Sequence, residues 1–413
     1  MTYSEIFTEI VSIMGKDSAT YPDYGAGDYE KYKGLIRDDM EKKDFLHVVR
    51  DYLSTFKVHG HLRLDDSNTG GVGFSVMRNG DKLFVTSANR ETGLVPGDEI
   101  TAIDSVSVPE VAEKEKNMLM GESQEREGGL WSAFLPFYKS VTVSHADDST
   151  EEIALKLGIK SEPTESYEHR KIDDNTFYMR FNDFADEEAI TKLYEDCRQD
   201  LDSCKNLIID VRGNIGGADT AFYPLIEYCF PADKPAQEYI VRKYPVEINY
   251  SERNCQDRLE IIKKFFGENI PEEIKPMVEK MISDVKENMG KGFVEDSEEI
   301  AAGVTGREKP EKVFIITDEN CGSTGDAFVE TMSFSPKVTV VGRPTAGALD
   351  YSNCSMVQFD DFTLVYPTSR DSRISHGEGM GQKGVPVDVY IPWKPENFGK
   401  DVELKYVLEQ IKA

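Results

Sequence analysis

The sequence places a serine at the predicted start of a helix. Residues 313–318 form an apolar strand pattern, and a glycine-containing turn at 319–326 carries Ser323 directly before a helical pattern. The positive end of a helix stabilises negative charge that develops on a serine hydroxyl during nucleophilic attack. Serine is also a preferred N-cap, so this residue alone is compatible with a structural role. Cys321 is an alternative nucleophile at the same turn.

A second glycine-rich turn lies earlier in the chain. The predicted strand 206–210 leads into Val-Arg-Gly-Asn-Ile-Gly-Gly at 211–217 and then into a helix. Unobstructed backbone amides at such a turn bind anions or a developing oxyanion. Phosphate sites use similar turns, but neither Gly-Lys-Ser/Thr nor Gly-x-Gly-x-x-Gly occurs here. An oxyanion site is therefore the favoured interpretation.

Three motifs in this order resemble the core of the tail-specific (C-terminal processing) and tricorn-type serine peptidases. They are Asp-x-Arg-x-Asn-x-Gly-Gly at 210–217, Glu-Asn-Cys-Gly-Ser-Thr-Gly-Asp at 319–326 and Val-Gly-Arg-Pro-Thr-Ala-Gly-Ala at 341–348. The resemblance covers roughly residues 45–390. It implies an α/β fold with a core related to the Clp-protease and crotonase superfamily. It also implies a serine endopeptidase that cleaves extended or unfolded polypeptides through an acyl-enzyme.

The resemblance also implies roles for the residues of both turns. The nucleophile position of the family motif falls on Ser323. The amide of Thr324, together with one from Gly216 or Gly217, would form the oxyanion hole. One branch of the family uses a lysine base just after the third motif, where this chain has Ala348. The chain is therefore similar to the branch that uses a histidine.

In the histidine branch the base follows a helix and precedes a PDZ-like domain. The element Val58-His59-Gly60-His61 stands at that place, and we expect His61 to be the general base, with His59 as the alternative. A neutral imidazole can accept the serine proton near pH 7.

A glutamate from the C-terminal part of the core completes the site in the tricorn-like branch. Here the region 376–386 departs from the usual acidic pattern. We expect Glu378 to orient the histidine, and Asp350 and Asp388 remain alternatives.

Residues 67–158 resemble a PDZ domain. The loop Gly71-Val72-Gly73-Phe74 and the turn Pro-Gly-Asp-Glu-Ile at 96–100 carry this resemblance. It implies that the loop amides bind the terminal carboxylate of a peptide, which would add to a sheet edge as a strand. The alternative is an ordinary β-rich domain with glycine turns.

The remaining sequence divides into two further regions. Residues 1–66 form a helical N-terminal region, and residues 159–413 alternate strands and helices as an α/β core. A helical insertion at about 252–290 interrupts this core, either as a lid or as a packing element.

Composition limits the partners. The net charge of −28 disfavours nucleic acid and anionic membrane surfaces, and no long apolar stretch predicts a membrane span. We expect polypeptide substrates, no cofactor and no metal, since His-Glu-x-x-His is absent and two histidines supply too few ligands. A homo-oligomer is compatible with the sequence.

The expected location is the cytoplasm. The start carries Glu5 and Glu9 within its apolar stretch and lacks a basic region, unlike a signal peptide. Removal of a leader from the chain would change this expectation to an extracytoplasmic location. The six cysteines are sparse and read as reduced thiols.

Two other functions stay open from the sequence. A peptide-binding protein with weak or lost catalysis would explain the unusual region 376–386. An acyl-CoA enzyme on the related crotonase fold would also use paired glycine-turn amides, although the serine-bearing turn and the PDZ-like segment count against it.

Overall fold

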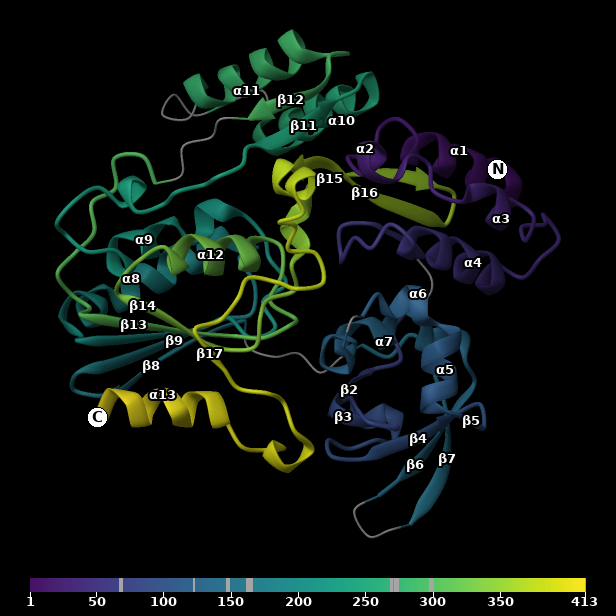
Figure 1. Ribbon diagram of the computed structural model, residues 1–413, viewed down its shortest axis with the longest axis horizontal. Coiled ribbons are helices and arrows are strands. Elements are labelled where there is room, and N and C mark those ends of the chain that lie inside the picture. Colours follow the sequence, from purple (N-terminus) through teal and green to yellow (C-terminus); the bar gives the residue numbers. More distant parts are fainter. Residues whose placement is uncertain are drawn as a thin grey trace. The chain divides into compact units, whose positions relative to one another are not determined.

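The computed structural model describes residues 1–66, 70–121, 123–145, 149–160, 166–267, 270, 275–296 and 301–412 (Figure 1). The chain separates into two compact units. The first comprises Met1–Asn68, Lys243–Glu298 and Asp350–Gly379, and the second comprises Thr69–Arg242, Glu299–Leu349 and Met380–Ala413. The predicted domain boundary at 66–67 falls at the edge of the described residues. Within the predicted insertion, residues 268–269 and 271–274 lie outside them.

The second unit contains a six-stranded sheet in the order β17-β14-β13-β10-β9-β8. All neighbours are parallel except β8 and β9. The strands are β8 (Tyr167–Asp173), β9 (Thr176–Phe181), β10 (Asn206–Asp210), β13 (Lys312–Thr317), β14 (Val338–Gly342) and β17 (Val389–Tyr390). The predicted alternation of strands and helices in an α/β core is confirmed.

Helices cover both faces of this sheet (Figure 1). They are α8 (Glu187–Ser203), α9 (Tyr223–Cys229) and α12 (Thr324–Ser333) on one face and α13 (Val402–Lys412) on the other. Because successive side chains of a strand point to opposite faces, β10 contributes Leu207 and Ile209 to the α12 side and Ile208 to the α13 side. A strand buried on both faces needs such a continuous apolar run.

A small β domain, residues 70–160, belongs to the same unit. Its sheet has the order β2-β3-β4-β6-β7, with β5 beside β4. Its strands are β2 (Phe74–Asn79), β3 (Lys82–Ala88), β4 (Glu99–Ile103), β5 (Val106–Ser107), β6 (Ser140–Ser144) and β7 (Thr150–Ala154). Between β5 and β6 the chain forms α5 (Val108–Lys114), α6 (Lys116–Leu119) and α7 (Gly128–Phe134). Trp131 and Phe134 of α7 are fully buried in this domain's core.

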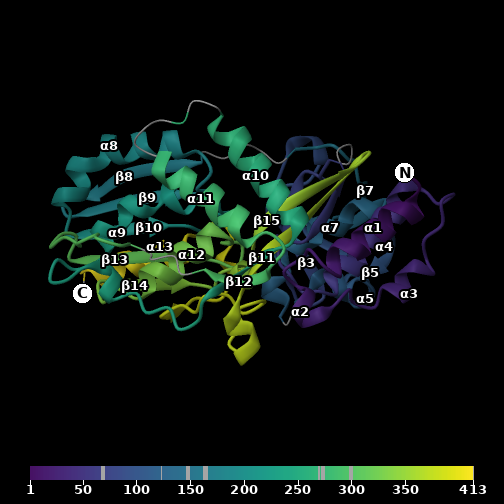
Figure 2. The same cartoon turned by 90° about the horizontal axis from the view of Figure 1, so that it is seen from above.

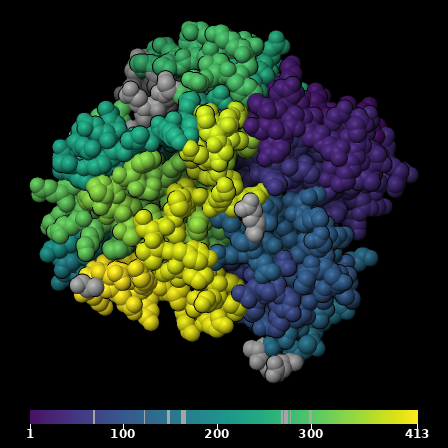
Figure 3. All heavy atoms as spheres, in the orientation of Figure 1, coloured from purple at the N-terminus to yellow at the C-terminus, as the bar shows by residue number. Residues whose placement is uncertain are grey.

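Polar contacts join the small β domain to the rest of its unit. Arg126 donates to the carbonyls of three successive residues, at 3.3 Å to Pro344, 2.7 Å to Thr345 and 3.0 Å to Ala346. The neighbouring Glu125 accepts from the C-terminal segment, which is yellow in Figure 3 and adjoins the blue small β domain. The small domain is therefore anchored on the loop that follows β14.

The first unit has its own sheet and helices. The sheet order is β1-β16-β11-β12, with β15 beside β16. Its strands are β1 (Arg63–Asp66), β11 (Val246–Tyr250), β12 (Gly292–Asp296), β15 (Tyr351–Phe359) and β16 (Phe362–Asp371). Its helices are α1 (Tyr3–Met14), α2 (Tyr21–Tyr24), α3 (Tyr29–Lys33), α4 (Lys42–Ser54), α10 (Glu252–Phe266) and α11 (Lys275–Asn288). Helices α1 and α4 lie side by side (Figures 1 and 2), where Tyr3 stacks on Phe45.

The units cut across the regions expected from the sequence. Strand β16 pairs with β1 from the N-terminal region and with β11, which directly precedes the predicted insertion. Backbone hydrogen bonds of one sheet thus join segments that are far apart in sequence. None of the helices in the described ranges is both long and apolar enough to cross a membrane.

Candidate active site

Ser323 lies at the turn between β13 and α12. Its backbone has φ 59° and ψ −122°, a region that non-glycine residues rarely occupy and that costs about 1–3 kcal/mol. Strained serines of this kind stand at strand-to-helix turns that expose the hydroxyl. The surrounding structure therefore holds Ser323, the predicted nucleophile, in backbone angles that a serine rarely adopts.

The two glycine-rich turns predicted from the sequence meet at this serine. A Cβ atom on Gly216 would lie 2.6 Å from Cβ of Ser323 and 3.0 Å from the amide nitrogen of Thr324. Its φ of 88° independently favours glycine. Only glycine allows the backbone at 216 to approach the serine this closely.

The hydrogen bonds around Gly217 orient its backbone. The amide of Phe184 donates to the carbonyl of Gly216, and the amide of Ala218 donates to the carbonyl of Phe184. The polar groups of Gly217 therefore point the other way, and its carbonyl accepts from the Thr324 hydroxyl at 2.9 Å.

Within the described ranges, the amides of Gly217 and Thr324 have no hydrogen-bond acceptor. The amide of Gly216 instead donates to Oδ1 of Asn214 at 2.9 Å. Of the two glycines expected from the resemblance, Gly217 is therefore the one whose amide is not occupied by a described acceptor.

Asp326 supports the serine turn through hydrogen bonds, a role that sequence reasoning did not identify. Its fully buried carboxylate accepts from the amides of Ser323 at 2.8 Å, Gly347 at 2.8 Å and Ala348 at 2.9 Å. Burial raises the pKa of Asp326 to about 6, against these hydrogen bonds, which lower it. The carboxylate thus ties the nucleophile turn to the third motif.

Cys321 does not share the exposure of Ser323. Its side chain is fully buried in the hydrophobic core under α12. This burial raises the pKa of the Cys321 thiol well above its ordinary value, whereas a nucleophilic cysteine needs a lowered pKa. The alternative cysteine nucleophile finds no support.

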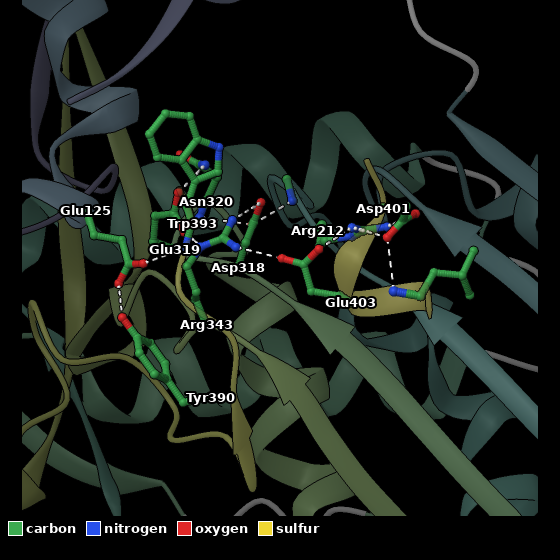
Figure 4. A network of polar contacts seen from close by, with 12 residues as sticks. Glu125, Arg212, Asp318, Glu319, Asn320, Arg343, Tyr390, Trp393, Asp401 and Glu403 are labelled. Atoms are coloured by element: carbon green, nitrogen blue, oxygen red, sulfur yellow. Dashed lines mark hydrogen bonds and ion pairs between the residues drawn. The ribbon is translucent and has the colours of Figure 1, made fainter. Parts of the chain in front are cut away.

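A network of buried charged residues connects the segments that follow β10, β13 and β14 (Figure 4). Arg212, after β10, contacts Asp210 at 2.6 Å, and Arg343, after β14, contacts Glu319 at 2.6 Å. Glu403 of α13 bridges the two guanidinium groups, at 3.2 Å and 2.8 Å respectively. Burial raises the pKa of Glu319 to about 7.

The same network borders a cavity of about 780 Å³ in the second unit. Its wall includes the edge of β2, the start of α7 and the ends of β10 and β13. Asp318 is part of this wall and accepts from the amide of Gly213 at 2.8 Å. Carboxyl ends of parallel strands are where ligands bind in open α/β sheets, and Arg212, Gly213 and Asp318 of the cavity wall directly follow such strand ends.

His61 belongs to the first unit and follows a tight turn before β1. Its Nδ1 lies 2.6 Å from the main-chain carbonyl oxygen of Tyr351, the first residue of β15. Its amide contacts the carbonyl of His59 at 2.7 Å. A backbone carbonyl therefore positions His61, the histidine that the resemblance favoured. A sequence motif of side chains could not reveal this contact.

Glu378 has partners other than His61. Its exposed carboxylate accepts from Nζ of Lys243 and from the hydroxyl of Tyr244, the latter at 2.8 Å. These partners lower the pKa of Glu378. The structure does not bring Glu378 to the histidine.

The two alternative carboxylates have other surroundings. Asp388 accepts from the amide of Val340, in the middle of β14 in the second unit, at 2.8 Å. Asp350 is buried in the first unit, where a Cβ atom on Gly379 would lie 2.8 Å from its carboxylate.

The loop expected to bind a peptide carboxylate packs against its own domain. Val72 forms a parallel bridge with Ile159, and a Cβ atom on Gly73 would lie 2.3 Å from the Ile159 side chain. Phe74, the first residue of β2, is buried and borders the cavity. One side of the loop Gly71–Phe74 is therefore taken up by the chain at residue 159.

Comparisons with known proteins identify a family for most of this region. A sequence model of peptidase family S41 matches residues 175–391, which is more than half of the 413 residues. No curated protein matches the chain.

Solved structures share the fold at low identity. Mature CPAF in complex with lactacystin has a TM-score of 0.66 at 13% identity, covering 100% of this chain and 97% of that one. A putative peptidase from Parabacteroides merdae has a TM-score of 0.50 at 13% identity, covering 100% and 98%. These likenesses extend over the whole chain, beyond the residues that the family model matches.

Proposed function

Because the chain belongs to peptidase family S41 and is therefore a serine-type peptidase, we propose that it is an endopeptidase acting on extended or unfolded polypeptides. Ser323 is the nucleophile and His61 is the general base. The observation that carries this proposal is the strained Ser323 beside two amides without acceptors, those of Gly217 and Thr324.

The proposed reaction follows from these groups. The hydroxyl of Ser323 attacks the scissile carbonyl carbon while the imidazole of His61 takes the hydroxyl proton. The amides of Gly217 and Thr324 donate to the oxyanion of the tetrahedral intermediate. Collapse breaks the C–N bond as the imidazolium returns the proton to the leaving amine, and water then hydrolyses the serine ester by the same route.

Substrate capture by the small β domain remains part of the proposal. The resemblance assigns the loop Gly71–Phe74 to a peptide carboxylate, and the cavity extends along the adjoining β2. Because Ile159 covers one side of the loop, a peptide would use the remaining side. An extended chain fits a cavity bordered by a strand edge better than a folded protein does.

Incubation with casein tests the proposed function. Wild type, Ser323→Ala, His61→Ala and the neighbouring control His59→Ala are each incubated, and fragments are identified by mass spectrometry. We expect fragments from wild type and from the control, and a loss of about 10³-fold or more in the other two. Cleavage by Ser323→Ala would overturn the nucleophile, and cleavage by His61→Ala alone would overturn the base.

A covalent probe separates catalysis from binding. A fluorophosphonate reacts with activated serines, so labelling of wild type at Ser323 is expected without any peptide. If no variant cuts casein and the probe does not react, the alternative of a peptide-binding protein without catalysis replaces the proposal.

A further inference from the structure

One partner of the His61 ring is a neutral backbone group in the same unit. Nδ1 of the imidazole lies 2.6 Å from the carbonyl oxygen of Tyr351, a hydrogen-bond distance. We propose that the Tyr351 carbonyl orients His61 and holds the ring proton on Nδ1, where serine hydrolases often use a carboxylate. This inference deepens the proposed function, since it rests on His61 being the general base.

The chemistry of the contact selects one tautomer. A carbonyl oxygen can only accept a hydrogen bond, so the contact requires a proton on Nδ1. In the neutral imidazole the lone pair then resides on Nε2. Nε2 is therefore the nitrogen that accepts the serine proton, and the second nitrogen keeps its partner when the ring becomes charged.

The carbonyl is held rigidly enough for this role. Tyr351 pairs with Arg370 of β16 through the backbone, and its hydroxyl donates to Oδ2 of Asp23 at 2.9 Å. Arg370 in turn contacts Oδ1 of Asp23 at 3.0 Å and Glu247 at 2.8 Å. Burial and the neighbouring Asp23 raise the pKa of Tyr351, so the hydroxyl stays a donor at working pH.

The backbone of His61 is equally constrained. Gly60 has φ 68°, and the His61 carbonyl accepts from Sγ of Cys354 at 3.6 Å. Two residues later, Arg63 pairs with Val365 of β16. Strand β16 therefore supports both the imidazole and its acceptor, and supporting groups of this kind keep catalytic geometry within about 0.5 Å.

The carbonyl differs from a carboxylate in charge. A carboxylate would stabilise the imidazolium by a full negative charge, whereas a carbonyl offers only a dipole. The carboxylate expected from the sequence, Glu378, is engaged by Lys243 and Tyr244. The contact with the Tyr351 carbonyl therefore orients the ring through a dipole.

Nitrogen NMR of the histidine rings tests the proposal directly. The chain has 6 histidines, and His61→Gln identifies the signals of residue 61 in protein labelled with ¹⁵N-histidine. At about pH 8, where imidazoles are mostly neutral, we expect an N–H signal for Nδ1 and a lone-pair signal for Nε2. The opposite pattern would overturn the inference.

A matched pair of tyrosine variants tests the support of the carbonyl. Tyr351→Phe removes the hydroxyl that anchors Tyr351, and Tyr366→Phe removes a buried hydroxyl that donates to Asn254 at 2.9 Å in the same unit. We expect Tyr351→Phe to lower kcat roughly threefold to tenfold at unchanged KM and to raise the population protonated on Nε2. Equal effects of the two variants would contradict the proposal.

The two levels of the argument can fail separately. If wild type carries its proton on Nδ1 but His61→Ala still cuts casein, the carbonyl contact stands and the general base is another group, so the inferred catalytic role fails. If His61→Ala is inactive and the proton sits on Nε2, the proposed function stands and the inference on Tyr351 fails.

Discussion

Ser323 in the second unit is surrounded by buried charges and a strained backbone, whereas His61 in the first unit is held by a neutral carbonyl. Asp326, Glu319 and Glu403 fix the serine side through carboxylates. Tyr351 fixes the histidine side through its main chain. The serine side therefore depends on buried carboxyl groups and on glycine at close approaches, and the histidine side depends on the register of β15 against β16.

The largest expected effect is at Gly216. In Gly216→Ala the new Cβ would lie 2.6 Å from Cβ of Ser323, so the turn or the serine must shift. We expect kcat/KM on a peptide substrate to fall by about 10²-fold or more.

Gly213→Ala is the matched control in the same turn. It also has a positive φ, of 72°, but its Cβ would meet nothing within 4 Å. We expect a stability cost of about 1 kcal/mol with little change in kcat. Equal losses of activity in the two variants would show that glycine is needed at position 216 for its positive φ and not for its close approach to Ser323.

The next effect is the loss of the bridging carboxylate. Glu403→Ala leaves buried guanidinium groups of Arg212 and Arg343 without one partner, which costs about 3–5 kcal/mol when a buried pair is broken. Urea unfolding measures this, with the exposed Glu409→Ala of the same helix as control. A loss below 1 kcal/mol would mean that the two arginines are sufficiently held by Asp210 and Glu319.

A smaller effect is a pH dependence of stability on the serine side. Because burial raises the folded-state pKa of Glu319 to about 7, the folded state binds its proton more tightly than the unfolded state does. The resulting stabilisation is complete below about pH 4.5 and is lost as pH rises to about 7.

Glu319→Gln cannot titrate at this position. Unfolding free energies measured from pH 4.5 to 7 should therefore fall more steeply for wild type than for Glu319→Gln, and the exposed Glu308→Gln should follow wild type. Parallel curves for all three proteins would mean that the Glu319 carboxyl does not titrate in this range.

The smallest expected effect is at Glu378. Its carboxylate lies on the surface with Lys243 and Tyr244, so we expect kcat of Glu378→Ala to stay within about twofold of wild type. A loss comparable with that of His61→Ala would restore Glu378 as the orienting group and would weaken the assignment to Tyr351.

The serine side could be predicted because its signals are local. Strand, turn, helix start and glycine positions follow one another within residues 207–217 and 313–326, and both turns meet as expected. The choice between Gly216 and Gly217 could not be made from the sequence, since it depends on which amide Asn214 occupies.

The histidine side could be predicted only in part. The sequence indicated His61 through a family resemblance. The hydrogen-bond acceptor of its ring, however, is a backbone oxygen 290 positions away in the chain. Because every residue has a backbone carbonyl, no residue type marks this acceptor in the sequence. The sheet of the first unit was missed for a similar reason. Strand β16 is buried along most of its length, so it lacks the alternation that marks a half-exposed strand.

The small β domain cannot be removed without a structural effect on the core. Its Arg126 donates hydrogen bonds to the carbonyls of Pro344, Thr345 and Ala346. The amide of Ala346 donates to the carbonyl of Cys321 at 2.7 Å, two residues before the nucleophile. Deleting the small domain would remove this bracing as well as any capture of substrate. An inactive deletion variant would thus be ambiguous, and Arg126→Gln in the full chain would measure the bracing alone.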